Sequence, residues 1–230
     1  MPTTPPKAVL FDAGNTLVWL DHPCMVQVLR EHGVETSVGE IMDAEYRFKL
    51  LMDATAREKG EERARGSRYF AEIFRLLGVP EAVWASVAQR LFARHEVKHL
   101  WSSVRERTTE TLDELRRRGY RLGVISNADG RVESLLEAVG LRPHFELVID
   151  SGAVGIDKPD PRIFRMAAER MGVQPHEAVY VGDIYEIDVQ GARAAGMRAI
   201  LIDPRNRWGH LDCDRIAALH DLLDVLPEAA

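Results

Sequence analysis

Five short apolar runs constrain the fold of this chain more than any other feature of its sequence. Each run is apolar at successive positions rather than at alternate positions, and polar or glycine residues follow it closely. A run that is apolar on both faces is typical of a parallel sheet that helices cover on both sides. We therefore expect buried strands at Ala8–Asp12, Leu122–Ser126, Leu147–Asp150, Ala178–Asp183 and Arg198–Asp203.

Amphipathic segments alternate with the later runs. Apolar residues recur at helical spacing within residues 108–115, 132–139 and 163–171, and a glycine follows each segment as a helix stop. Asp129 is a candidate N-cap for the second segment. Because strands and helices alternate, we expect an α/β fold with a Rossmann-like parallel sheet and right-handed crossovers.

The stretch between the first two runs has a different character. It shows no convincing strand pattern and is rich in Glu, Arg, Ala and Leu, with glycines as punctuation. We expect about four helices here, inserted after the first strand. The predicted domains are an α/β core formed by residues 1–19 and 101–230, and a helical unit formed by residues 20–100. The core should finish with a short strand at Arg215–Leu219 and a helix at His220–Leu226.

Composition excludes several classes of protein. The net charge is -6 and no long basic run is present, which argues against a nucleic-acid surface. No apolar run approaches the roughly 20 residues that a membrane span needs. The two cysteines, Cys24 and Cys213, form no CxxC pair, so we expect free thiols in a reducing cytoplasm.

Polar side chains follow the predicted strands where each strand ends. Asp12 ends the first strand, Ser126 and Asn127 end the second, and Asp183 ends the fourth, while Lys158 lies after the third. Any one of them could be an ordinary turn residue or helix cap. However, the carboxyl ends of parallel strands meet at one edge of the sheet, where open α/β folds place their ligand sites.

These side chains together suggest a phosphate site. Asp12 and Asp183 would repel each other without a cation between them, and Mg²⁺ is commonly held by one or two carboxylates. An anion could bind beside the two carboxylates, held by Lys158 and by the Ser126 hydroxyl. The backbone N–H groups of the Gly14–Thr16 turn could form an anion nest for it. The Asp12 carboxylate could then attack phosphorus, giving an acyl phosphate that water cleaves.

Four motifs follow one another along the chain. They are Val9–Leu17 (VLFDAGNTL), Val124–Asn127 (VISN), Lys158–Pro161 (KPDP) with Ile163 and Phe164, and Val181–Asp183 (VGD) with Asp188, Gly191-Ala192 and Ala195–Met197. In type, order and spacing they resemble the motifs of the haloacid-dehalogenase superfamily, and the match spans Lys7 to about Asp203. The insert between the first two motifs resembles the helical cap of that family, which closes over the substrate.

The resemblance implies a magnesium site. Asp12 is implied to be the catalytic nucleophile and a metal ligand. The backbone carbonyl of Gly14 and the carboxylate of Asp183 are implied to complete the protein's share of the Mg²⁺ shell. Thr16 is implied to brace the turn of the first motif.

The resemblance also implies a phosphate-binding set. Ser126, Asn127 and the catalytic Lys158 are implied to hold the phosphoryl oxygens of a small phosphorylated metabolite. Asp188 is implied to orient either a metal-bound water or Lys158.

One position departs from the family pattern. Phosphatases of the family usually carry a second Asp, as general acid and base, where this chain has Gly14. Such a group typically contributes about 10²- to 10⁴-fold in rate. Dehalogenases of the family lack it and need no metal, but their fourth motif usually lacks the Gly182-Asp183 pair seen here. Phosphonatases lack it too and use a cap lysine, for which Lys49, Lys59 and Lys98 are candidates by location.

Three hypotheses follow. The first is a hydrolase of this family that transfers a phosphoryl group, with Mg²⁺, through an aspartyl-phosphate on Asp12. The second is a hydrolase of the same fold that cleaves a C–P or C–halogen bond. The third is a non-catalytic phosphate- or protein-binding member that lacks the acid at position 14.

Overall fold

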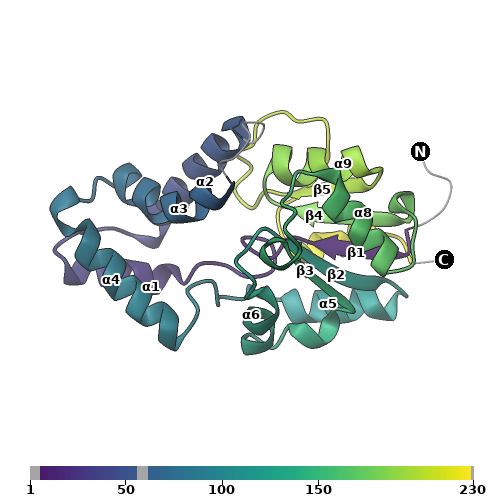
Figure 1. Ribbon diagram of the computed structural model, residues 1–230, viewed down its shortest axis with the longest axis horizontal. Helices are drawn as coiled ribbons and strands as arrows, with labels where there is room; N and C mark the ends of the chain where they lie inside the picture. Colours follow the sequence, from purple (N-terminus) through teal and green to yellow (C-terminus); the bar gives the residue numbers. More distant parts are fainter. Residues whose placement is uncertain (1–5, 56–61, 229–230) are drawn as a thin grey trace. The chain divides into compact units, whose positions relative to one another are not determined.

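The computed structural model of the protein describes residues 6–55 and 62–228, with backbone only for residues 62–68. The chain divides into two compact units (Figure 1). We call Met1–Trp19 with Val104–Ala230 the core unit, and Leu20–Ser103 the helical unit. Among the described residues, no helix combines the length and the apolar character that crossing a membrane requires.

The core unit is built on a parallel sheet, which confirms the predicted α/β class. In the described part of the chain the sheet has six strands in the order β3-β2-β1-β4-β5-β6, and every neighbouring pair is parallel. All five predicted main strands are present, and the expected sixth begins one residue early and is shorter. The strands are β1 (Ala8–Phe11), β2 (Arg121–Ser126), β3 (Leu147–Asp150), β4 (Ala178–Gly182), β5 (Arg198–Ile202) and β6 (Asp214–Ile216).

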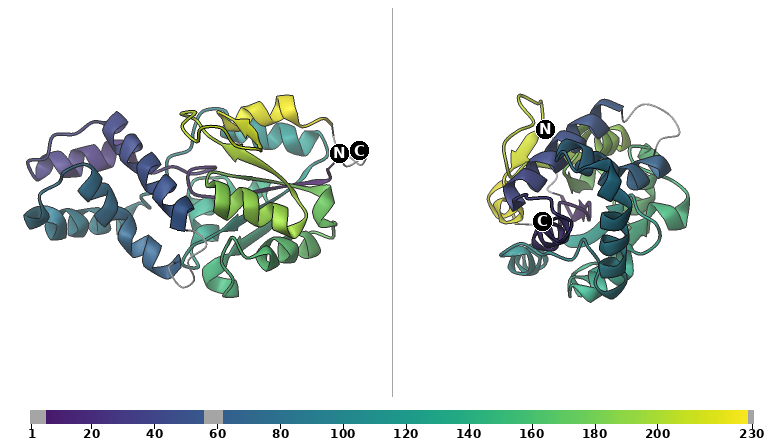
Figure 2. Two further views of the ribbon diagram at one scale, coloured as in Figure 1. Left: turned by 90° about the horizontal axis from the view of Figure 1, so that it is seen from above. Right: turned by 90° about the vertical axis from the view of Figure 1, so that its left-hand side faces the viewer.

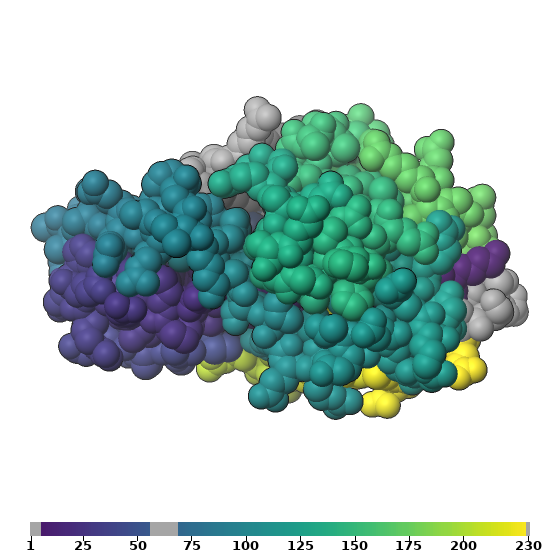
Figure 3. All heavy atoms as spheres, turned by 90° about the horizontal axis from the view of Figure 1, so that it is seen from below, coloured from purple at the N-terminus to yellow at the C-terminus, as the bar shows by residue number. Residues whose placement is uncertain are grey.

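Helices cover both faces of this sheet. In Figures 1 and 2, α8 and α9 lie on one face and α5 lies on the other. Figure 3 shows a face of the core unit whose surface is formed mostly by segments in the teal-to-green part of the colour scale, and all four residues of β1 are buried. The helices are α5 (Thr108–Arg117), α6 (Val132–Ala138), α7 (Ser151–Val154), α8 (Pro161–Arg170), α9 (Gly191–Ala195) and α10 (Leu222–Val225), with 3₁₀ turns at Arg142–His144, Pro175–Glu177 and Leu219–Asp221 and a π-helical turn, η3, at Tyr185–Gln190.

The start of α6 differs from the sequence-based expectation. Asp129 does not cap the helix, because its carboxylate pairs with Arg131 at 2.6 Å. Asp150, at the end of β3, accepts the Val132 N–H at 3.1 Å and the Gly152 N–H at 2.9 Å instead. The cap is thus supplied by a neighbouring strand, which sequence spacing along the helix could not indicate.

The helical unit has a hydrophobic core of its own. In the described part of the unit, its helices are α1 (His22–Glu31), α2 (Val38–Thr55), α3 (Glu62–Leu76) and α4 (Glu81–Val97). Side chains from these helices, including Leu29, Ile41, Phe74 and Leu91, are almost completely buried against one another. The unit also buries the polar side chains of His22, Glu45 and Lys49.

Candidate active site

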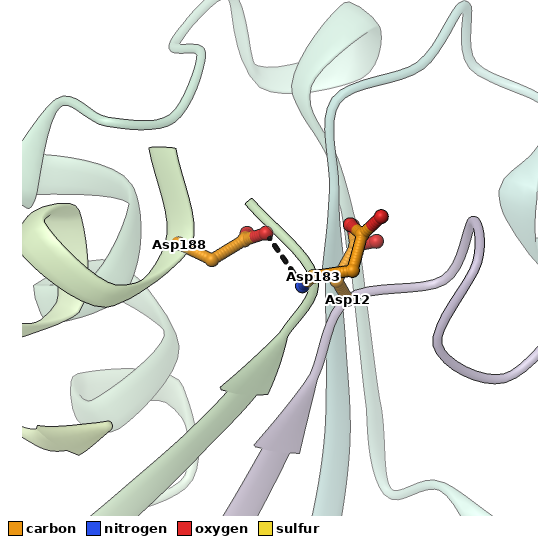
Figure 4. Close-up of side chains that lie close together, drawn as sticks. All are labelled: Asp12, Asp183 and Asp188. Atoms are coloured by element: carbon orange, nitrogen blue, oxygen red, sulfur yellow. Dashed lines mark hydrogen bonds between the residues drawn. The ribbon is translucent and has the colours of Figure 1, made fainter. Parts of the chain in front are cut away.

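Buried charges meet at the carboxyl edge of the sheet. Asp12 follows β1 and Asp183 follows β4, and these strands are neighbours with Phe11 paired to Val181. Asp188 reaches the same place from η3. Among the described residues, these three aspartates form one group in which one carboxylate oxygen from each lies within 4.8 Å of the others (Figure 4). All three residues are buried. The predicted convergence of Asp12 and Asp183 is therefore seen.

The ammonium of Lys158 lies among these carboxylates. Its Nζ donates to Asp12 Oδ1 at 2.7 Å, to Asp188 Oδ1 at 2.7 Å and to the Tyr180 hydroxyl at 2.8 Å. Because an ammonium has three N–H donors, these contacts use all of them. Burial by itself would lower the pKa of Lys158, but the charges of Asp12 and Asp188 outweigh it and raise that pKa well above its ordinary value. Lys158 is thus a fixed cation.

The electrostatic balance of the cluster is negative. Burial raises the pKa of Asp12 from 3.8 to about 7, the charge of Lys158 opposes the rise, and Asp188 and Asp183 add to it. One ammonium does not offset three carboxylates at this distance. The cluster is therefore suited to bind a further cation, and hard oxygen ligands of this kind suit Mg²⁺.

Asp188 organises the fourth motif. Its Oδ2 accepts the backbone N–H groups of Asp183 and Ile184, each at 3.0 Å, while its Oδ1 holds Lys158. A Cβ added at Gly182 would lie 2.4 Å from the Asp188 carboxylate carbon, so this approach requires glycine. Asp188 was expected to orient either a metal-bound water or Lys158, and the structure shows the contact with Lys158.

The turn of the first motif is held by its own backbone. The N–H groups of Asn15 and Thr16 donate to the carbonyls of Val18 and Ala13, at 2.7 and 3.4 Å. The predicted anion nest is therefore wrong for these two groups, because the tight turn satisfies them locally. The buried hydroxyl of Thr16 accepts and donates no hydrogen bond within the described residues. Gly14 has open space where a Cβ would lie and no left-handed φ.

The second motif contacts the third. Ser126 is buried at the end of β2, in register with Asp150. The side-chain amide of Asn127 donates to the Lys158 carbonyl at 2.9 Å, and its oxygen accepts the Lys158 N–H at 2.8 Å. Asn127, predicted to bind phosphate, thus fixes the backbone that carries Lys158. Its contact with phosphate stays a prediction.

One residue at the site was missed by sequence reasoning. Tyr180 lies within β4, in a run that indicates only a buried strand. A single hydroxyl in an otherwise apolar strand was the only available signal, and tyrosines of that kind are common in cores.

The candidate cap lysines lie in different settings. Lys49 is buried on α2, with its ammonium 5.0 Å from the centre of the Tyr46 ring. The exposed Lys98 forms an ion pair with Asp21 at 3.4 Å. Lys59 lies outside the described residues.

Comparison with known proteins identifies the family to which the chain belongs. The family model for haloacid dehalogenase-like hydrolases matches residues 6–196. The chain is 38% identical over 208 residues to haloacid dehalogenase-like hydrolase domain-containing protein 3 of Mus musculus, covering 85% of this chain and 81% of that protein. It is 33% identical over 245 residues to glyceraldehyde 3-phosphate phosphatase of Methanopyrus kandleri, covering 97% of this chain and 98% of that protein.

The solved structures agree. A HAD phosphatase from Thermococcus onnurineus matches with a TM-score of 0.64 and 29% sequence identity, covering 97% of this chain and 99% of that one. The chain therefore belongs to the haloacid dehalogenase-like hydrolase family, and it is an enzyme of that family.

Proposed function

We propose that the protein is a Mg²⁺-dependent phosphatase that hydrolyses a small phosphorylated metabolite through an aspartyl-phosphate on Asp12. The observation that carries this proposal is the surplus of buried carboxylate over buried ammonium at the carboxyl edge of the sheet. The named phosphatases among the relatives support the same reaction class.

The residues present fit a magnesium ion. The Asp12 and Asp183 carboxylates and the Gly14 carbonyl are the oxygen ligands that would hold it. The raised pKa of Asp12 reflects burial next to other carboxylates, which is the environment that a divalent cation relieves. When bound, the ion would neutralise negative charge and align the phosphoryl group with the nucleophile.

The chain's own residues define the covalent step. Lys158 holds Oδ1 of Asp12, which leaves the other carboxylate oxygen for attack on phosphorus. A bond forms between an Asp12 carboxylate oxygen and phosphorus as the ester P–O bond breaks, and the leaving alkoxide takes up a proton from solvent water. Water then attacks phosphorus, releases inorganic phosphate and restores the carboxylate. Ser126 is proposed to donate to a phosphoryl oxygen. Lys158 is proposed to hold the phosphoryl group through its positive charge, because its three N–H donors already have partners in the protein, and Asn127 is proposed to contribute by fixing Lys158.

The helical unit is proposed to be the cap that selects the substrate. We prefer phosphate hydrolysis to dehalogenation because the carboxyl edge of the sheet carries Asp183 and a surplus of carboxylate. A metal-free attack on carbon does not require that surplus. Cleavage of a C–halogen or a C–P bond would give a different result in the experiment that follows.

Turnover of a panel of phosphate esters tests the proposal. The panel includes p-nitrophenyl phosphate and glyceraldehyde 3-phosphate, each assayed with Mg²⁺ and with a chelator. We expect phosphate release that requires Mg²⁺ and is lost in Asp12→Asn. Halide release from a 2-haloacid without metal would select a dehalogenase instead. Phosphonate cleavage would select the C–P hydrolase, and phosphate binding without turnover would select the non-catalytic class.

A further inference from the structure

Tyr180 places a hydroxyl in the middle of the buried sheet. It is completely buried in β4, where the strand reads AVYVG, and its ring packs edge-on against Phe164 with centroids 4.9 Å apart. The ring fills the hydrophobic core between the sheet and α8. A phenylalanine would fill the same volume, so packing accounts for the ring but not for the hydroxyl.

The hydroxyl contacts the catalytic end of Lys158. It lies 2.8 Å from Lys158 Nζ, 3.1 Å from the Ile125 carbonyl oxygen and 3.3 Å from Asp188 Oδ1. A protonated lysine donates and cannot accept, so in the first contact the tyrosine oxygen is the acceptor. The phenol proton is then available to the Ile125 carbonyl or to Asp188. Burial raises the pKa of Tyr180 well above its usual value, so the hydroxyl stays neutral and keeps that proton.

These contacts define the position of the ammonium from three directions. Asp12 and Asp188 hold it electrostatically, each at 2.7 Å, and Tyr180 supplies the third acceptor. Without the hydroxyl, one N–H of a buried ammonium would lack that acceptor, which is unfavourable. The side chain would then gain freedom to move relative to Asp12.

We propose that Tyr180 is a positioning residue that fixes the Lys158 ammonium against the nucleophile Asp12. It acts on the reaction through Lys158 and is not itself a catalytic residue. The expected effect on kcat rests on the proposed function, whereas the contact between Tyr180 and Lys158 can be tested without turnover.

The kinetic test compares two variants that each lose one buried tyrosine hydroxyl. Tyr180→Phe removes the contact with Lys158. Tyr120→Phe is the matched control, because Tyr120 is also buried in the core unit and its hydroxyl donates to the Pro227 carbonyl at 2.6 Å. We expect kcat to fall about tenfold in Tyr180→Phe, as for the loss of one hydrogen bond to a charged group, with KM within about threefold. Both constants should stay within about twofold in Tyr120→Phe.

The variants are assayed well below the melting temperature of each. A merely structural role for Tyr180 would lower the melting temperature and leave kcat per folded molecule unchanged. An unchanged kcat in Tyr180→Phe, or an equal fall in Tyr120→Phe, would overturn the inference.

A second measurement does not depend on activity. Lysine labelled with ¹⁵N at Nζ is incorporated into the metal-free protein, and the Lys158 signal is assigned by its loss in Lys158→Arg. We expect the ammonium protons of Lys158 to exchange slowly enough with water to be observed at neutral pH. In Tyr180→Phe the exchange should be at least about tenfold faster, because one of three hydrogen bonds is gone.

The two measurements separate failure of the inference from failure of the proposed function. If the wild type hydrolyses no phosphate ester but its Lys158 signal is protected and depends on Tyr180, the proposed reaction is wrong and the positioning contact stands. A Lys158 ammonium that exchanges too fast to observe in the wild type would overturn the inference even if Tyr180→Phe did not fold.

Discussion

The core unit and the helical unit both bury polar side chains, but they balance the charges differently. In the helical unit, one oxygen of the buried Glu45 carboxylate lies 2.5 Å from His22 Nε2. The other oxygen accepts a hydrogen bond from the Tyr69 hydroxyl. Both oxygens of that carboxylate are therefore satisfied within the unit. Such a network links α1, α2 and α3 and needs no ligand to account for it.

The core unit leaves charge in excess. There, the carboxylates of Asp12, Asp183 and Asp188 share the ammonium of Lys158, and the pKa of Asp12 rises to about 7. Buried charge is costly unless it is paired, so an unbalanced cluster persists where a ligand completes it. The charge balance of a buried polar cluster, rather than its burial, therefore distinguishes a ligand site from a structural network.

The largest expected effect comes from Asp12, the proposed nucleophile. Asp12→Asn should lower kcat by at least about a thousandfold, because an amide cannot form the covalent intermediate. The melting temperature should not fall, since the change removes one of three repelling carboxylates. Steady-state kinetics and thermal unfolding of the purified variant check both points. Near-wild-type turnover would refute the assignment of Asp12.

The next effect concerns the metal. Asp183→Ala should weaken Mg²⁺ binding by about a hundredfold or more and abolish turnover, because it removes a carboxylate that we propose as a ligand of the ion. Isothermal titration of Mg²⁺ into the wild type and the variant measures the difference. Equal affinities would show that the surplus of carboxylate at this edge is not the metal site.

A gain of function is expected at Gly14. A Cβ there meets no atom within 4 Å and the backbone has no left-handed φ, so Gly14→Asp should fold normally. The new carboxyl can protonate a poor leaving group, and kcat/KM for an alkyl phosphate should rise about a hundredfold. The value for p-nitrophenyl phosphate should change little, because nitrophenolate leaves without a proton. A variant with an unchanged melting temperature and no gain on the alkyl substrate would show that Gly14 is not simply a missing acid.

The smallest effect is expected in the helical unit. Glu45→Gln should reduce stability by about 1 to 3 kcal/mol, because it removes the charge that strengthens two buried hydrogen bonds. The melting temperature should fall by roughly 2–4 °C per kcal/mol. Glu35→Gln is the control, since that side chain is 83% exposed. The affinity for Mg²⁺ should be unchanged, and a weakened affinity would contradict the contrast between the two units.

The sheet was predictable because strands buried on both faces appear in the sequence as unbroken apolar runs. Once the strands were in place, parallel topology required Asp12 and Asp183 to end at the same edge. Hydrogen-bond partners were harder to predict from the sequence than the strands. The cap of α6 comes from Asp150 rather than Asp129, and Tyr180 meets a lysine 22 positions earlier in the chain. Such contacts depend on how side chains pack in three dimensions, which periodicity does not record.

Trapping the covalent intermediate tests the central claim most directly. Wild-type enzyme mixed with a substrate and Mg²⁺ is quenched during turnover and reduced with borohydride, which converts an acyl phosphate to an alcohol. Mass spectrometry of the peptide containing Asp12 should then show the side chain of homoserine at that position, and no such product should form without Mg²⁺. Turnover that leaves Asp12 unmodified, or a reduced carboxylate elsewhere in the chain, would contradict the proposed mechanism.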